Sequence, residues 1–169
     1  MAGYFSGLAI LGLLGLAHYY LIASRWDRPW IKYVFITADI AIISWAVAAQ
    51  PVMPSDVLPA VFVFRFNVFP YYFLIMAVAA FSFSPGLVLW SGITGCVGWL
   101  SAFFWITGDM DTVLDWTDIP ANATYADYAA VVLSPDFAAL GSRYQECIVF
   151  LVVAILIAVL MRRAPSLTP

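Results

Sequence analysis

Residues 14–43, LGLAHYYLIASRWDRPWIKYVFITADIAII, hold two apolar runs on either side of a short polar turn. Three basic residues gather around that turn, Arg25, Arg28 and Lys32. About 20 predominantly apolar residues are enough for a helix to cross the hydrocarbon core of a bilayer. Basic clusters that flank such helices stay in the cytoplasm. The stretch therefore predicts a transmembrane helical hairpin with its turn on the cytoplasmic side.

The composition of the whole chain also indicates a membrane protein in contact with lipid. Of the 169 residues, 64% are hydrophobic and 10% are charged, and the mean hydropathy is +0.96, well outside the range of soluble globular domains. The net charge is −3 and the basic residues form no extended patch, so no nucleic acid partner is expected. The predicted fold class is all-α, an integral membrane helical bundle.

Five runs of the chain reach spanning length. They are residues 3–24, 31–49, 60–82, 86–107 and 142–161. A second basic pair, Arg162 and Arg163, follows the last run and marks another cytoplasmic end. With five spans the N-terminus lies outside. Residues 164–169 then form a cytoplasmic tail after a transmembrane domain of residues 1–163.

The long segment of residues 108–141 is expected on the outer side of the membrane. It holds six aspartates and neither lysine nor arginine, which agrees with an outer position. Within it, PANATYADYAAVVL at residues 120–133 is too short and too polar to span a bilayer. This run predicts a short surface helix that lies against the outer end of the bundle.

The third run is the least regular because it contains Arg65 and Pro70. Pro70 lacks a backbone donor, so a helix there kinks or begins late. A span that begins near Phe66 leaves Arg65 at the outer interface, and the cost of a buried arginine favours this alternative. A span that begins near Pro59 buries Arg65, and an ion pair with Glu146 would then compensate its charge.

The fourth run carries a strip of small residues. Gly92, Gly95 and Gly98 recur within it at a spacing of three and so share one side of a helix. In lipid, helices associate through close backbone approach and dispersion, and glycine leaves room for that approach. We therefore expect this helix either at the centre of the bundle or on an oligomer interface.

Two ionisable residues lie inside the first two apolar runs, His18 and Asp39. Each is seven residues from a flanking basic residue, so both are expected about 10 Å inside the cytoplasmic interface. A polar pair at one depth can be a structural clasp between the two helices. It can also recognise a lipid-soluble ligand, such as a quinone, or respond to protonation. A third alternative is that the two residues face different neighbours.

The chain lacks the sequence signatures of common enzymes. It contains no zinc-protease, dinucleotide, P-loop or serine-hydrolase motif. Cys96 and Cys147 lie in apolar runs without the spacing of a metal site or a disulfide scaffold, and we expect them to be small buried residues. We accordingly expect no catalytic residue and no metal site in this chain.

A resemblance to a known family rests mainly on three motifs: GLAHY at residues 15–19, the stretch from RPW at residues 28–30 to Asp39, and SPGLVLW at residues 84–90. Over residues 10–163 the chain is similar to the N-terminal membrane domain of bacterial class III adenylate/guanylate cyclases. The resemblance implies a dimeric signal-transduction module of the bacterial inner membrane. It places a cyclase domain after the terminal arginines, and the catalytic residues of such a domain are absent from this chain.

Two functions follow as hypotheses. One is a non-catalytic membrane anchor or sensor of the cyclase type, active as a homodimer through helix contacts. The alternative is a small accessory transmembrane subunit of a photosynthetic or respiratory complex. A homodimer that responds to a lipid-soluble ligand favours the first hypothesis. Co-purification in a fixed ratio with pigment or redox subunits favours the second.

Overall fold

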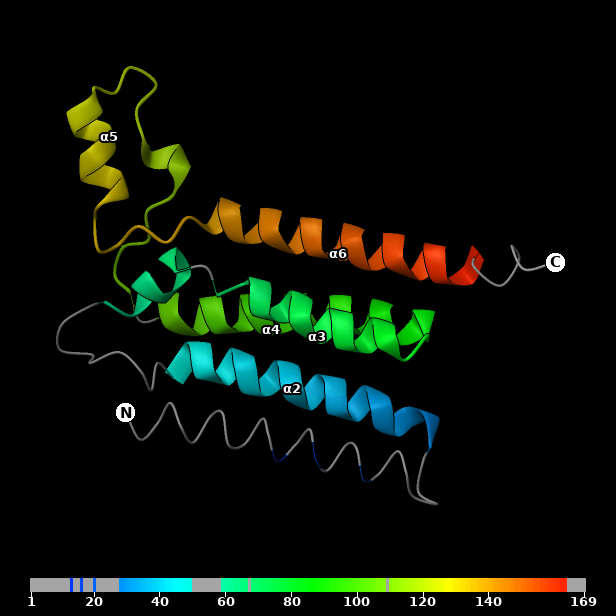
Figure 1. Ribbon diagram of the computed structural model, residues 1–169. Coiled ribbons are helices and arrows are strands. Elements are labelled where there is room, and N and C mark those ends of the chain that lie inside the picture. The colour runs from blue at the N-terminus through cyan, green and yellow to red at the C-terminus, as the bar shows by residue number, and fades with distance from the viewer. Residues whose placement is uncertain are drawn as a thin grey trace.

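The computed structural model describes residues 28–49, 59–66, 68–108 and 110–163, together with Leu13, Leu16 and Tyr20. Within this part the regular secondary structure consists of helices, and the strand-like pairing is an isolated β-bridge between Leu114 and Phe137. Four helices lie side by side as a bundle (Figure 1). They are α2 (Pro29–Ala49), α3 (Pro70–Phe81), α4 (Pro85–Thr107) and α6 (Leu140–Arg163). Three short helices complete the described part, η1 (Ala60–Arg65), η2 (Trp116–Asp118) and α5 (Tyr125–Val132).

Three of the bundle helices are long and apolar enough to cross a membrane, α2, α4 and α6. They correspond to the predicted runs 31–49, 86–107 and 142–161. Pro29 and Pro85 occupy their first turns in α2 and α4, where a missing backbone N–H costs no hydrogen bond. The predicted run 3–24 lies outside the described residues except for Leu13, Leu16 and Tyr20, and so does the predicted tail of residues 164–169.

The third predicted span, residues 60–82, is wrong as a single helix. The structure divides it into η1 and α3, with extended backbone at Phe66 and the start of α3 at Pro70. Pro70 cannot donate to a preceding turn, so the chain begins a new helix there. Twelve residues of α3 rise about 18 Å, which is shorter than a hydrocarbon core of about 30 Å. Arg65 is therefore the last residue of η1 and not part of a continuous spanning helix.

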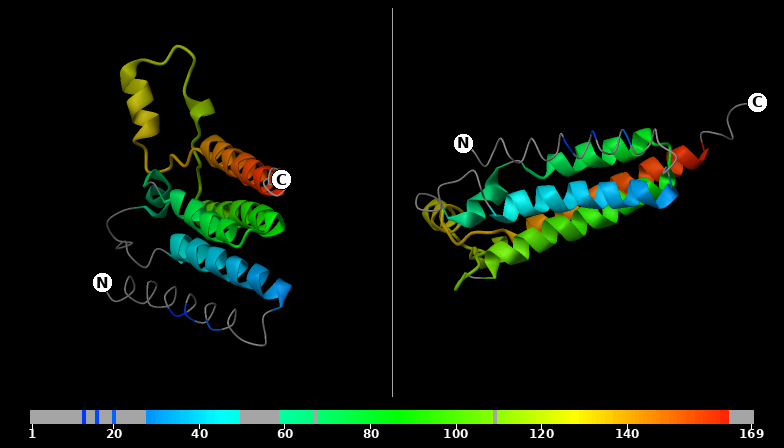
Figure 2. Two further views of the ribbon diagram at one scale, coloured as in Figure 1. Left: turned by 45° about the vertical axis from the view of Figure 1, so that its right-hand side comes forward. Right: turned by 90° about the horizontal axis from the view of Figure 1, so that it is seen from below.

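The two ends of the bundle differ in charge: four of the six described basic residues lie at one end, whereas the described aspartates of residues 110–139 lie at the other end together with Arg65 and Arg143. The first turn of α2, the α3–α4 turn and the last turn of α6 lie at one end of the bundle (Figures 1 and 2). This end carries Arg28, Lys32, Arg162 and Arg163. The opposite end, called the acidic end below, holds η1 and the segment of residues 110–139. The described aspartates of that segment are Asp111, Asp115, Asp118, Asp127 and Asp136.

Helix α4 is the centre of the bundle and packs against α2, α3 and α6. Trp99 on α4 is fully buried and contacts the rings of Phe69 and Tyr72, with centroid distances of 5.2 and 5.7 Å. The Tyr72 hydroxyl is 2.8 Å from the hydroxyl of Ser44 on α2, so this buried polar pair joins α2 to α3.

Helix α5 stands apart from the bundle at the acidic end (Figure 1). It covers eight residues of the predicted surface helix at residues 120–133. A reciprocal capping box fixes its start, since Thr124 Oγ1 accepts from the backbone N–H of Asp127 and the Asp127 carboxylate accepts from the backbone N–H of Thr124.

Acid is expected to weaken the first turn of α5. The hydroxyl and backbone N–H of Thr124 donate to Asp127 Oδ2 at 2.7 and 2.9 Å, and these bonds lower the pKa of Asp127. Because the pKa of Asp127 is lower in the folded helix than in the unfolded chain, its carboxylate stabilises the helix at pH values above the unfolded pKa of about 4. This stabilisation is lost as the pH falls through the folded pKa. In Thr124→Ala we expect the Asp127 carboxyl, followed by NMR, to titrate at higher pH. Thr112→Ala, a control at an exposed position, should leave the midpoint of the Asp127 titration unchanged. Equal Asp127 midpoints in the parent, Thr124→Ala and Thr112→Ala proteins would contradict the prediction.

Candidate functional site

The start of α6 is held in place by the segment at the acidic end. The backbone N–H of Leu114 donates to Asp136 O at 2.9 Å, and that of Ala138 donates to Leu114 O at 3.1 Å. The Asp115 carboxylate accepts from the Gly141 backbone N–H at 3.2 Å, which places a negative charge at the N-terminus of α6. The first turns of α6 therefore have a defined orientation relative to the bundle.

Arg143 and Glu146 form an ion pair in these first turns. Arg143 Nη1 lies 3.0 Å from Glu146 Oε1, and the two residues are three positions apart on α6. Their side chains are 11% and 29% exposed. Because both groups are largely removed from solvent, each depends on the other to compensate its charge.

Two further contacts tie this ion pair to other elements. Trp99 Nε1 on α4 donates to Glu146 Oε2 at 2.8 Å, and Arg143 Nη1 donates to Phe64 O of η1 at 3.2 Å. The Arg143 guanidinium also lies 5.8 Å from the ring centroids of Phe64 and Trp99. Arg143 Nε is buried without a hydrogen-bond partner among the described residues. We call these three residues, Arg143, Glu146 and Trp99, the charged cluster; it joins α6 to α4 and η1.

A groove of about 280 Å³ lies beside the charged cluster, between α3 and α6. One wall, called the α3 wall below, is formed by the aromatic rings of Phe73 on α3 and of Phe69, the residue before α3, and the other wall by polar and small apolar residues of α6. The lining residues are Phe69, Phe73, Ser142, Gln145, Glu146 and Val149. This position gives the groove an aromatic wall that faces a carboxylate and an amide, which is the usual arrangement of a small-ligand site.

A second groove, of about 340 Å³, lies between α2 and α4. Its lining residues are Tyr33, Val34, Thr37, Ala38, Ala41 and Trp90. The indole N–H of Trp90 already donates to Thr37 Oγ1 at 2.9 Å, and the Thr37 hydroxyl donates to Tyr33 O at 2.7 Å. The Trp90 indole and the Thr37 hydroxyl of this groove therefore already have partners, and the groove beside the charged cluster, which has a carboxylate and an amide in its lining, is the stronger candidate site.

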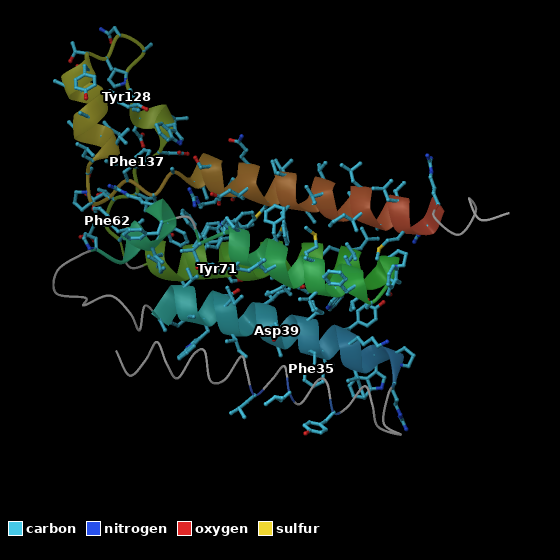
Figure 3. All side chains as sticks on the ribbon, viewed as in Figure 1. Phe35, Asp39, Phe62, Tyr71, Tyr128 and Phe137 are labelled. Carbon is cyan, nitrogen blue, oxygen red and sulfur yellow. The ribbon has the colours of Figure 1, made fainter. Side chains whose placement is uncertain are left out.

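The alternative of an ion pair between Arg65 and Glu146, which depended on a span that begins near Pro59, does not hold in the described part, because Glu146 pairs with Arg143. Arg65 instead donates to the backbone carbonyls of Ser134 and Phe137. Its guanidinium carbon lies 4.1 Å from the ring centroid of Phe62, and Phe62 and Phe137 lie at the same end of the molecule (Figure 3). Arg65 thus links η1 to the loop before α6, and because the residue is exposed it needs no carboxylate partner.

The predicted pair of His18 and Asp39 falls partly on residues that the structure does not describe, since His18 is outside them. Asp39 lies near the middle of α2 and is half-buried (Figure 3). Within the described part, its carboxylate makes no hydrogen bond or ion pair. The pair stays a prediction.

The three glycines of the small-residue strip, Gly92, Gly95 and Gly98, lie at two interfaces of α4. A Cβ atom on Gly92 would lie 2.8 Å from Ala154 Cβ of α6, and one on Gly95 would lie 2.6 Å from the Phe150 ring. A Cβ atom on Gly98 would overlap Ser44 and Ile40 of α2. The small-residue strip therefore serves two neighbours at once, which is how α4 reaches its central position.

Sequence reasoning missed Arg143 and Trp99. The predicted fifth run contained Arg143 and Glu146 at a spacing of three, and this spacing brings opposite charges together on a helix. That local signal could have identified the ion pair. Trp99 gave no such signal, because only the packing of α4 against α6 brings its indole to Glu146.

The described residues contain no group of three histidine, cysteine, aspartate or glutamate side chains that could hold a metal ion. Cys96 and Cys147 are free and buried, and Cys96 Sγ lies 3.4 Å from Cys147 O. Comparison of the chain with protein-family models, with curated proteins and with solved structures finds no match.

Proposed function

We propose that the chain is a non-catalytic membrane anchor and sensor module that passes a change at its acidic end along α6 through helix contacts. The observation that carries this proposal is the charged cluster, which couples the start of α6 to α4 and η1. Helix α6 is continuous for 24 residues, about 36 Å, and ends at Arg162 and Arg163. A rigid helix of this length transmits a displacement of its first turns to its last turn.

The proposal places the bundle in the bacterial inner membrane, with the terminal arginines in the cytoplasm. Three candidate spanning helices support a membrane location. Four of the six described basic residues lie at the end opposite the aspartates, and this excess supports the orientation, because positive charge is retained on the cytoplasmic side. The sequence resemblance to cyclase membrane domains supports the signalling role.

Helix α6 also presents an apolar surface away from the bundle. Its exposed members include Ile148, Val152, Ile155, Leu156, Val159 and Leu160. Such a surface suits lipid, a second copy of the chain or a larger complex. A native-mass measurement of the detergent-extracted particle separates these cases. A homodimer supports the sensor, whereas a fixed ratio with pigment or redox subunits supports the alternative of an accessory subunit.

A cross-linking experiment tests the transmission along α6. Leu160 is 67% exposed near the last turn, so Leu160→Cys in a Cys96→Ala, Cys147→Ala background reports contact between copies in lipid vesicles. Adding Glu146→Gln removes a charge from the far end of α6. A contact worth about 1 kcal/mol shifts an equilibrium about fivefold, and we expect a change of that order in the disulfide-linked fraction.

Asp136→Asn is the matched control, because it makes the same chemical change at the acidic end but outside α6 and without an ion pair. We expect the linked fraction of this control to equal that of the parent. If Glu146→Gln leaves the linked fraction at the parent value as well, the charged cluster does not communicate with the last turn and the sensor proposal is wrong.

A further inference from the structure

We infer that the groove between α3 and α6 binds a lipid-soluble phenol, that is, a hydroxyl-bearing aromatic ring on an apolar tail. The inference deepens the proposed function, since it rests on the membrane location and names the class of ligand at the charged cluster. It is carried by the chemistry of the two walls and by the size of the space between them.

The α6 wall offers unused hydrogen-bonding capacity to the ligand hydroxyl. Glu146 accepts one bond at each oxygen, from Arg143 and from Trp99, and each carboxylate oxygen has a second lone pair. Gln145 is exposed, and its amide makes no hydrogen bond to another described residue. A hydroxyl that enters the groove can therefore donate to Glu146 and accept from Gln145.

The charge balance of the site favours a neutral ligand. The negative charge of Glu146 is already compensated by Arg143 at 3.0 Å, so a cationic head is not required. An anionic head, such as a lipid phosphate, would lie against the carboxylate while Arg143, only 11% exposed, is turned to Glu146 and Phe64 O. A neutral hydroxyl donor brings no additional charge next to the ion pair of Arg143 and Glu146.

The α3 wall suits an aromatic ring. Phe69 and Phe73 are perpendicular to each other, with an interplanar angle of 87° and a centroid distance of 5.8 Å. Phe150 already packs against both rings and Phe69 is only 7% exposed, so the aromatic surface left for a ligand ring belongs to the partly buried Phe73. The groove volume of about 280 Å³ is roughly twice that of the ~150 Å³ cavity known to hold benzene. A substituted ring fits, and its tail leaves along the exposed side of α6 at Val149.

Photolabelling tests this inference with a defined probe. The probe is a 4-alkylphenol with a diazirine on the first carbons of its tail, added to the full chain in lipid vesicles. Label is expected on the peptides that contain Phe69 and Phe73 or Gln145 and Val149. Unlabelled 4-nonylphenol should displace it, and the methyl ether 4-nonylanisole, which has no donor, should be about tenfold weaker because it loses a hydrogen bond to a charged group.

Two tryptophan variants separate the groove from the lipid-facing surface. Val149→Trp fills the groove and should reduce displaceable labelling about tenfold or more. Val152→Trp is the matched control, because Val149 and Val152 are 50% and 49% exposed on the same helix and Val152 does not line the groove. We expect the control to label as the parent does.

Three labelling outcomes and one displacement outcome overturn the inference. Labelling that spreads along α6, equal displacement by the methyl ether, or no effect of Val149→Trp would show that the groove does not select a phenol. Displacement by phosphatidylglycerol but not by nonylphenol would assign the groove to a lipid headgroup. If the phenol binds but Glu146→Gln does not change cross-linking at position 160, this inference stands and the sensor proposal is rejected. If Glu146→Gln changes cross-linking but the phenol does not bind, only this inference is rejected.

Discussion

Replacement of Glu146 by leucine is expected to lower the free energy of unfolding by about 3 kcal/mol. The substitution leaves the Arg143 guanidinium, 11% exposed, without its carboxylate, and it removes the acceptor of the Trp99 indole N–H. Loss of one partner from a buried pair costs 3–5 kcal/mol, and the partial exposure of Glu146 places this case at the lower limit. Unfolding of the purified protein in detergent, followed by near-ultraviolet circular dichroism against denaturant, measures the change.

Two further variants separate the lost charge from lost packing. In the double variant Arg143→Met, Glu146→Leu, neither charge is present, and we expect most of the stability to return. Gln145→Leu is the control for apolar substitution at a neighbouring exposed position, and its effect should be within about 0.5 kcal/mol of zero. A Glu146→Leu protein as stable as Gln145→Leu would mean that the ion pair contributes nothing to the fold.

Replacement of Gly98 by alanine is expected to separate α2 from α4 at a cost of about 2 kcal/mol. The new Cβ atom would overlap the Ser44 hydroxyl and lie 2.9 Å from Ile40 Cγ2, so the backbones of the two helices must move apart. The same displacement strains the bond between the Ser44 and Tyr72 hydroxyls, which are 2.8 Å apart. Thermal unfolding in detergent, followed at 222 nm, should show a lower midpoint.

Gly141→Ala provides the matched control for this prediction. A Cβ atom at Gly141 would lie 3.6 Å from Asp115 Oδ2, an ordinary van der Waals contact, although the residue is also helical. Alanine favours the helix over glycine, so this control should be at least as stable as the parent. Equal midpoints for Gly98→Ala and Gly141→Ala would show that the α2–α4 interface tolerates a larger separation.

Local sequence determined the extent of the three helices that are long and apolar enough to cross a membrane. A helix that can cross a membrane is defined by the length and composition of one continuous run, and both are readable without knowing any neighbour. The runs at residues 31–49, 86–107 and 142–161 are therefore found as α2, α4 and α6. Proline at the first turns of α2 and α4 marked their starts for the same local reason.

The third run shows the limit of this reasoning. Its composition alone predicted one span over residues 60–82, whereas the structure has η1, extended backbone at Phe66 and then α3. Both Arg65 and Pro70 were visible as irregularities. The choice between their alternatives depended on the carbonyls of Ser134 and Phe137, which are distant in sequence and offer Arg65 acceptors that no local pattern indicates.

The sequence by itself determined which segments are apolar helices, how charge is distributed between their ends, and that the glycines of α4 permit close approach. Only the tertiary structure decided which faces meet. It brings Glu146 to Trp99 and Arg143 to Phe64 of η1, whereas Arg65 at the end of η1 bonds to the carbonyls of Ser134 and Phe137. The physical reason is that lipid is as apolar as the bundle interior, so a spanning helix is hydrophobic on all sides and carries no polar face to show its orientation. The partners of its few charged groups therefore depend on how the helices pack side by side, and the sequence of a single helix does not reveal that packing.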